Sequence, residues 1–271
     1  MKQKETFNNT IRFLTSVFLL LLILTSTTQV FSQEKKQDKW EFSLTPYLWL
    51  AGNHGDAAIK GRSFSVDQDF SDIMENLDFS FQLHLETKKG KSGLLFDFLF
   101  LSFSNGADIR SSTLGSEGEN WVLEFGGFHQ IAKWKLGQNA KRSIYVDALG
   151  GLRFWHLGLD VDFETESLGK FSVGDDKNWA DPYLGARLNT RFTDKLLFKF
   201  RGDIGGFGIT DYSSKLTWNV RTDLSYDVSQ LITLSLGYRG QGVNYSEGSG
   251  DNYMEYDVTM DGVLIGVNFN F

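Results

Sequence analysis

Ten segments in which apolar and polar side chains alternate are the feature that most constrains the fold of this chain. Most of them have ten or more residues, whereas a strand of a soluble protein usually has about five or six. Strands of this length and pattern are typical of β-strands that cross a bilayer at a tilt. The segments are Trp40–Ala51, Leu77–Lys88, Ser92–Ser104, Asn120–Trp134, Arg142–Leu157, Trp179–Phe192, Leu196–Phe207, Lys215–Val228, Leu231–Asn244 and Tyr253–Phe271.

The alternation separates a bulky apolar face from a strongly charged face. In the segment Leu196–Phe207, for example, Phe198 and Phe200 alternate with Lys199 and Arg201. After the N-terminal region no apolar run is long enough for a membrane-spanning helix. A chain that crosses the membrane as strands has to close into a barrel, because only then are all its main-chain groups hydrogen-bonded.

The connections between the segments alternate between short and long, as in outer-membrane barrels with tight periplasmic turns and long external loops. The short connections are 89–91, 135–141, 193–195 and 229–230, and the long ones are 52–76, 105–119, 158–178, 208–214 and 246–252. The sequence therefore predicts an all-β fold, a transmembrane antiparallel up-and-down β-barrel of about ten strands. Twelve strands are the alternative, if Ala57–Val66 and a part of Gly158–Val173 both span.

The N-terminal region has the pattern of a secretory signal peptide. Lys2, Lys4 and Arg12 precede the apolar run Phe13–Leu24, and Ser32 offers a small residue before a cleavage site. We expect residues 1–32 to be the signal peptide and residues 33–271 to be the barrel domain. An N-terminal membrane anchor is the alternative, but the apolar run is short for a spanning helix.

The composition excludes several classes of function. The chain has no cysteine, which excludes disulfides and sites that use a thiol. Its formal net charge is −7, so nucleic acid is not an expected partner. The alternative to a membrane barrel is a soluble antiparallel protein of the periplasm.

The tryptophans and the last segment suggest how the barrel meets the membrane. Aromatic rings collect at membrane interfaces, so we expect Trp40 and Trp134 at the periplasmic interface, and the remaining tryptophans at the outer interface. That outer group is Trp49, Trp121, Trp155, Trp179 and Trp218. Lipid and lipopolysaccharide are then the surroundings of a monomeric barrel in the cell outer membrane.

In the last segment, alternate apolar residues run from Val263 to Phe271, and an apolar strand that ends in Phe resembles the signal read by the barrel-insertion machinery. Acidic residues occupy the same odd positions before Gly262. This change of pattern predicts a β-bulge near Gly262, which would turn Asp257 toward the lumen.

Three stretches resemble a family of uncharacterised, porin-like outer-membrane β-barrel proteins of Gram-negative bacteria. They are TPYLWLAG (Thr45–Gly52), FSDIMENLDF (Phe70–Phe79) and KGKSGLLFDFLFLSFS (Lys89–Ser104). The resemblance covers about the first half of the predicted mature chain. It implies the fold and the location, and brings no established activity.

The charged face predicts the residues that line the lumen, or pore. They are Glu86, Asp97, Glu124, Asp147, Arg153, Arg187, Arg191, Lys199, Arg201, Asp203, Arg221, Asp223, Arg239 and Asp257. A ten-stranded barrel is narrow enough for side chains to fill it. These residues could form a mixed-charge network that closes the lumen, or a charged constriction that passes ions or small polar solutes.

Two connections hold further candidate features. In Asp69–Asn76 we expect Ser71 to cap a short helix, with Asp72 and Glu75 near its N-terminus. This segment is either an external loop or a lid over the mouth of the barrel. The acidic connection Gly158–Asn178 does not have the spacing of an EF-hand calcium loop, and we expect it to be solvated.

Three functional hypotheses follow. The first is a small pore or passive channel for ions or small polar solutes. The second is a non-conducting structural or adhesion barrel that acts through its external loops. The third, a barrel protease or lipid-modifying enzyme, has less support, because no Ser–His–acid cluster occurs at a suitable spacing. We expect no enzymatic activity, no catalytic residue, no metal and no cofactor.

Overall fold

The computed structural model describes residues 39–109, 112–136, 142–165 and 169–271. The predicted signal peptide, residues 1–32, lies outside the described residues. Among the described residues, no helix has the length and apolar character needed to cross a membrane.

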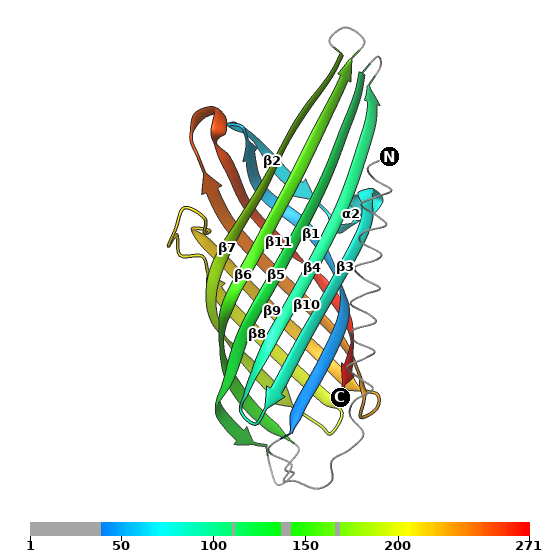
Figure 1. The fold of residues 1–271 in the computed structure, drawn as a ribbon. Helices are drawn as coiled ribbons and strands as arrows, with labels where there is room; N and C mark the ends of the chain where they lie inside the picture. Colours follow the sequence, from blue (N-terminus) through cyan, green and yellow to red (C-terminus); the bar gives the residue numbers. More distant parts are fainter. Residues whose placement is uncertain (1–38, 110–111, 137–141, 166–168) are drawn as a thin grey trace. The chain divides into compact units, whose positions relative to one another are not determined.

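The described residues form one antiparallel sheet that closes on itself (Figure 1). Its strands are β1 (Trp40–Ile59), β2 (Arg62–Gln68), β3 (Leu77–Lys89), β4 (Ser92–Ile109), β5 (Ser112–Lys135), β6 (Ser143–Thr165), β7 (Gly169–Arg191), β8 (Leu196–Gly205), β9 (Leu216–Asp227), β10 (Ile232–Glu247) and β11 (Met254–Asn270). A helix, α2 (Phe70–Asn76), and a 3-10 turn, η1 (Gly250–Asn252), complete the described elements. The barrel closes where β11 pairs with β1.

Ten strands make the closed barrel, as the sequence predicts, and β2 is an addition to its rim. β2 pairs only with the last part of β1, from Asn53 to Ile59. The twelve-strand alternative is therefore wrong: Ala57–Val66 forms a hairpin on one end of the barrel, and residues 158–165 and 169–173 belong to β6 and β7.

Several predicted external loops are extensions of strands. Residues 105–109 and 112–119 continue β4 and β5 in register, and residues 158–165 and 169–178 continue β6 and β7. The two hairpins rise well beyond β8 and β9 in Figure 1. The outer ends of these hairpins are rich in charged and small residues, so the sequence predicts polar loops there instead of strands.

The wall contains a seam between β1 and β3. These strands pair from Trp40 to Pro46 of β1, and β1 pairs with β2 only from Asn53 onward. Between these two ladders, the main-chain N–H of Trp49 donates to the side chain of Gln82 at 2.8 Å. A side-chain amide thus replaces part of the ladder, which satisfies a donor that would be costly to leave unpaired in a membrane.

The outer face of β11 shows where the membrane ends. Its register with β1 and β10 is unbroken, so the β-bulge predicted near Gly262 is wrong. Odd positions point outward along the whole strand: Val263 and Ile265 are exposed, and so is Asp257. The pattern changes at Gly262 because apolar side chains face lipid below it and acidic side chains face the external medium above it.

Gly262 itself is required by the close approach of β11 to β1. A β-carbon at this position would lie 2.0 Å from the main-chain oxygen of Leu50. Only glycine permits that approach without a shift of the strands.

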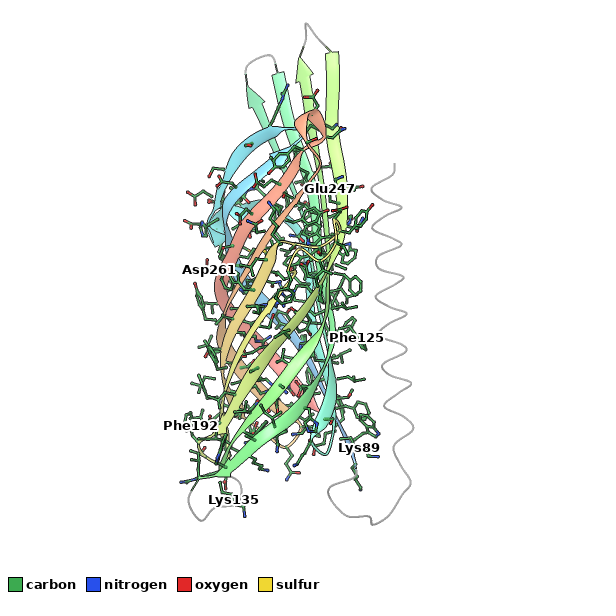
Figure 2. All side chains as sticks on the ribbon, turned by 90° about the vertical axis from the view of Figure 1, so that its left-hand side faces the viewer. Lys89, Phe125, Lys135, Phe192, Glu247 and Asp261 are labelled. Atoms are coloured by element: carbon green, nitrogen blue, oxygen red, sulfur yellow. The ribbon has the colours of Figure 1, made fainter. Side chains whose placement is uncertain are left out.

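The apolar outer surface continues around the barrel. Figure 2 shows side chains such as Phe125 and Phe192 on the outside of the wall, with Lys89 and Lys135 near the end that carries the short turns. Trp40 and Trp134 lie exposed near this same end, as predicted. In outer-membrane barrels, the end with short turns faces the periplasm.

Helix α2 forms in the connection where the sequence predicts it, but its cap is different. The N-cap residue is Asp69 rather than Ser71. The carboxylate of Asp72 accepts a hydrogen bond from the main-chain N–H of Asp69 at 3.0 Å, as in a capping box. Ser71, Asp72 and Glu75, the residues of the predicted lid, are all exposed.

The assigned membrane boundary leads to a prediction for two positions on the outer face of β11. Val267→Arg places a charge within the apolar band and should lower the free energy of unfolding in lipid vesicles by about 2–4 kcal/mol. Thr259→Arg, on the same face above the boundary, should change it by no more than about 1 kcal/mol. Urea unfolding of both variants measures the difference, and equal losses would contradict the boundary.

Candidate functional site

The lumen contains a row of four arginines on adjacent strands. The registers pair Arg187 of β7 with Arg201 of β8, Arg201 with Arg221 of β9, and Arg221 with Arg239 of β10. Like charges at directly opposed positions destabilise a sheet. The row can therefore exist only if carboxylates lie close enough to neutralise it.

Glu124 of β5 is the main acceptor for this row. Its carboxylate receives hydrogen bonds from Arg153 at 2.9 Å, from Arg201 at 2.8 Å and from Arg239 at 3.3 Å. The Glu124 side chain is completely buried. Asp203 accepts a further bond from Arg153 at 2.7 Å and another from Arg201 at 2.8 Å.

Asp97 of β4, the register partner of Glu124, completes this arrangement. It accepts hydrogen bonds from the Tyr47 hydroxyl at 2.8 Å and from Arg239 at 3.3 Å, and it lies 3.0 Å from the His84 ring. Three arginines and three carboxylates thus form a neutral layer across the lumen, which we call the ionic layer: Arg153, Arg201, Arg239, Asp97, Glu124 and Asp203. Paired, hydrogen-bonded charges can be buried in this way, whereas isolated charges cannot.

Aromatic side chains fill the lumen on the external side of the ionic layer. Trp155 and Trp179 stack with ring centroids 5.8 Å apart, and Trp179 stacks on Tyr245 at 4.3 Å. All three are buried in one apolar cluster, together with Trp49. The prediction that Trp49, Trp155 and Trp179 lie at the outer membrane interface is therefore wrong.

The indole nitrogens of this cluster are satisfied by polar groups. Trp155 donates to Asp181 at 2.8 Å, and Trp179 donates to the Ser214 hydroxyl at 2.9 Å. Ser214 in turn donates to Asp181 through both its main-chain nitrogen and its hydroxyl. This bonding allows Trp side chains to occupy a lumen position.

Trp121 and Trp218, by contrast, belong to the outer face of the wall. Trp121 stacks on His156 with ring centroids 5.3 Å apart. A β-carbon added at Gly242 would lie 2.1 Å from the indole nitrogen of Trp218, so this ring lies against the glycine of the neighbouring strand. These two positions agree with an aromatic belt.

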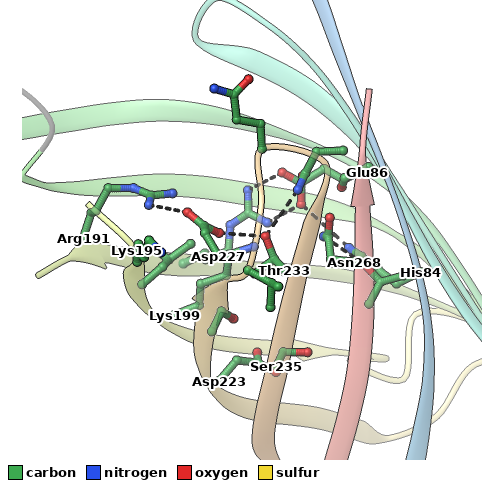
Figure 3. Close-up of a pocket in the computed structure, with 18 of the residues that line it drawn as sticks. His84, Glu86, Arg191, Lys195, Lys199, Asp223, Asp227, Thr233, Ser235 and Asn268 are labelled. Carbon is green, nitrogen blue, oxygen red and sulfur yellow. Dashed lines mark hydrogen bonds and ion pairs between the residues drawn. The ribbon is translucent and has the colours of Figure 1, made fainter. Parts of the chain in front are cut away.

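On the other side of the ionic layer, the lumen opens into a cavity of about 560 Å³ (Figure 3). Residues of the two short turns after β7 and β9, Asp194 and Ser229 among them, line its mouth. We call this cavity the vestibule. Because short turns mark the periplasmic end, the vestibule opens toward the periplasm.

Ion pairs also line the vestibule. Arg187 binds both oxygens of Glu86 and one oxygen of Asp147. Nearer the mouth, Arg191 donates to Asp227 at 2.7 Å. These pairs leave the vestibule polar and strongly charged but largely compensated.

The structure places all but one of the predicted lumen residues inside the barrel. Those inside are Glu86, Asp97, Glu124, Asp147, Arg153, Arg187, Arg191, Lys199, Arg201, Asp203, Arg221, Asp223 and Arg239. Asp257 is the exception: it is exposed on the outer wall and accepts a hydrogen bond from Asn244. Asp257 faces outward because β11 has no bulge, so that all its odd positions point away from the lumen.

Sequence reasoning missed several uncharged members of the site. Asn219 joins Asp203 to Arg239, and Thr217 accepts from Arg153 at 3.1 Å. Tyr183 contributes its ring, over which Arg153 and Arg201 both lie. All of these occupy the odd, lumen-facing positions of their strands, so the alternation contained the signal for them.

The external rim, outside the membrane, holds a pair formed by a histidine and an aspartate. His54 of β1 and Asp67 of β2 are joined at 2.9 Å. The Asp67 carboxylate, which accepts a hydrogen bond from the protonated ring, raises the pKa of His54 above its ordinary value. In the part of the chain that the structure describes, no cluster of His, Asp and Glu has an arrangement that could hold a metal ion.

Comparisons with known proteins add evidence on the fold. No protein-family model and no curated protein matches the chain. The crystal structure of the outer membrane protease OmpT from Escherichia coli matches with a TM-score of 0.54 at 8% identity, over 89% of this chain and 99% of that one. This match shows a shared fold alone.

Two further solved structures match less well. Ail, the attachment invasion locus protein of Yersinia pestis, matches with a TM-score of 0.37 at 10% identity, over 86% of this chain and 99% of that one. Neisserial surface protein A matches with a TM-score of 0.34 at 12% identity, over 86% of this chain and 100% of that one. The closed antiparallel barrel and its apolar outer band are those of a protein of the bacterial outer membrane.

The ionic layer leads to a prediction about stability. Glu124→Gln leaves three buried arginines with two carboxylates, and should lower the free energy of unfolding by about 3–5 kcal/mol. The matched control is Glu119→Gln on the same strand, where an exposed carboxylate lies 3.1 Å from His156. That change should cost no more than about 1 kcal/mol.

Denaturant unfolding in lipid vesicles, followed by tryptophan fluorescence, measures both variants. A second variant, Glu124→Gln with Arg201→Gln, restores the charge balance and should recover part of the lost stability. Small and equal effects of both single substitutions would contradict a tightly coupled layer.

Proposed function

We propose that this chain is a non-conducting outer-membrane barrel that acts through its external hairpins. One observation carries the proposal: the ionic layer and the aromatic cluster occupy successive levels of the same lumen. Arg153 and Glu124 are fully buried and Trp155 is 1% exposed, which supports a lumen filled by side chains at these levels. Of the two interpretations of the lumen charges, this geometry favours a network that closes the barrel.

The external part of the proposal is supported by the lengths of the strands. β5, β6 and β7 have 24, 23 and 23 residues, whereas β8 and β9 have 10 and 12. A strand needs about 9–11 residues to cross the membrane. The surplus forms a paired wall beyond the outer aromatic belt, which is a surface suited to adhesion or to a structural role in the envelope.

A small passive channel for ions or polar solutes is the second candidate, and the vestibule favours it. The vestibule already provides a charged, open path through the periplasmic half of the lumen. Conduction would then require the ionic layer to separate, and each separated charge would have to be hydrated.

The proposal includes no catalytic activity and no cofactor. Its partners are the lipids and lipopolysaccharide around the apolar band, with the protein as a monomer and without nucleic acid. The barrel-insertion machinery would recognise β11, which pairs with β1, together with Phe271, whose main chain bonds to that of Phe42.

Single-channel recording in a planar bilayer tests the proposal. The refolded protein should give no conductance steps, while a porin in the same bilayer serves as a positive control. Heat-modifiable migration on a gel verifies that the silent protein is folded. Reproducible steps whose ion preference changes in Arg201→Ala or Arg221→Ala would contradict the proposal and support a charged channel.

A further inference from the structure

One cation in the vestibule has no direct partner. Lys199 lies on the lumen face of β8, beside Asn189 of β7 and Asp223 of β9. Its ammonium group makes no hydrogen bond or ion pair with any residue that the structure describes. In Figure 3 its side chain lies among the residues that line the vestibule.

The carboxylates near Lys199 are already engaged by arginines. Both oxygens of Glu86 accept from Arg187. Both oxygens of Asp223 accept from Arg221, at 2.8 and 3.0 Å. Lys199 therefore has three N–H donors and no acceptor reserved for them among the residues that the structure describes.

The surface of the vestibule is richer in cations than in anions. Six cations line it: Arg187, Arg191, Lys195, Lys199, Arg201 and Arg221. Four acids line it: Glu86, Asp194, Asp223 and Asp227. Three carboxylates that bind these arginines do not line the vestibule: Glu124 and Asp203, which bind Arg201, and Asp147, which binds Arg187 together with Glu86.

We propose that the vestibule binds a small oxyanion, a phosphate or a carboxylate, from the periplasmic side, with Lys199 as its principal contact. A charged oxygen would accept from the free ammonium group and become the missing counter-ion. Charge-assisted hydrogen bonds of this kind are stronger than neutral ones.

The rest of the lining sets the class of ligand. Hydroxyl and amide groups such as those of Thr233, Ser235 and Asn268 surround the site. The aliphatic lining is limited to Leu95, Leu197 and Val228. A cavity of about 560 Å³ with this lining suits a compact hydrophilic solute rather than an apolar one.

Binding of this solute does not require a conducting barrel. The ionic layer closes the inner end of the vestibule, so the ligand would enter and leave through the same periplasmic mouth. This site therefore stands apart from the proposed external role.

Isothermal titration of the full-length chain in uncharged detergent micelles tests the inference. Inorganic phosphate and succinate are the two ligands, and the arm that gives saturable binding identifies the preferred oxyanion. Lys199→Gln should weaken that binding roughly tenfold or more, because one charge-assisted contact is lost. Lys199→Arg keeps the charge and should retain binding.

The matched control is Lys215→Gln, which removes the same charge from an exposed position in the loop between β8 and β9. It should leave the affinity unchanged. Heat-modifiable migration of each variant shows that the barrel is intact. The inference is overturned if neither anion binds the folded protein, or if Lys199→Gln and Lys215→Gln bind equally well.

Discussion

The four paired arginines of β7 to β10 are the constraint on which the rest of the structure depends. Positive side chains on neighbouring strands repel one another, and a narrow barrel cannot hydrate each of them separately. Carboxylates must therefore neutralise them. Asp203 and Asp223 do so from the same strands as Arg201 and Arg221, and others reach in from strands across the lumen. Glu124 does so from β5 and Asp97 from β4, and each bond joins one wall of the barrel to another. The charges that the sequence predicts as pore-lining are thus paired with one another across the lumen.

This layer divides the lumen into two unlike compartments. Toward the external end, aromatic rings exclude water and bury their N–H groups against Asp181 and Ser214. Toward the periplasmic end, the vestibule remains open and charged. The two ends of the molecule are therefore suited to different tasks, with paired hairpins at one end and a solute-sized cavity at the other.

The alternation in the sequence predicted the barrel, its ten strands and nearly all of its lumen charges. The alternation also indicates the correct face for Trp155 and Asp257, for which other expectations led to the wrong prediction. Trp155 has the same parity as Arg153, so alternation alone places it inside, whereas the expectation of an aromatic belt placed it outside. Asp257 likewise has the parity of Val263, so alternation alone places it on the outer face. The predicted bulge rested on the expectation that a charged residue faces the lumen.

Other features were not available from one sequence. Glu86 meets Arg187 and Asp97 meets Arg239 across 101 and 142 residues, and no local pattern indicates which acid serves which arginine. The seam bridged by Gln82 could not be predicted either. It depends on the residue at which β1 stops pairing with β3 and begins to pair with β2. Lys199 could be assigned to the lumen, but only the pairings of the described residues show that none of them binds its ammonium group.

The measurement that tests closure of the lumen most directly is thiol labelling from the periplasmic side. The chain has no native cysteine, so single substitutions report without background. Ser235→Cys lies in the vestibule, and Gln241→Cys lies on the same face of β10 at a buried position. We predict that a charged, membrane-impermeant reagent labels the first rapidly and the second only after unfolding. Equal labelling of both in the folded barrel would contradict a closed lumen.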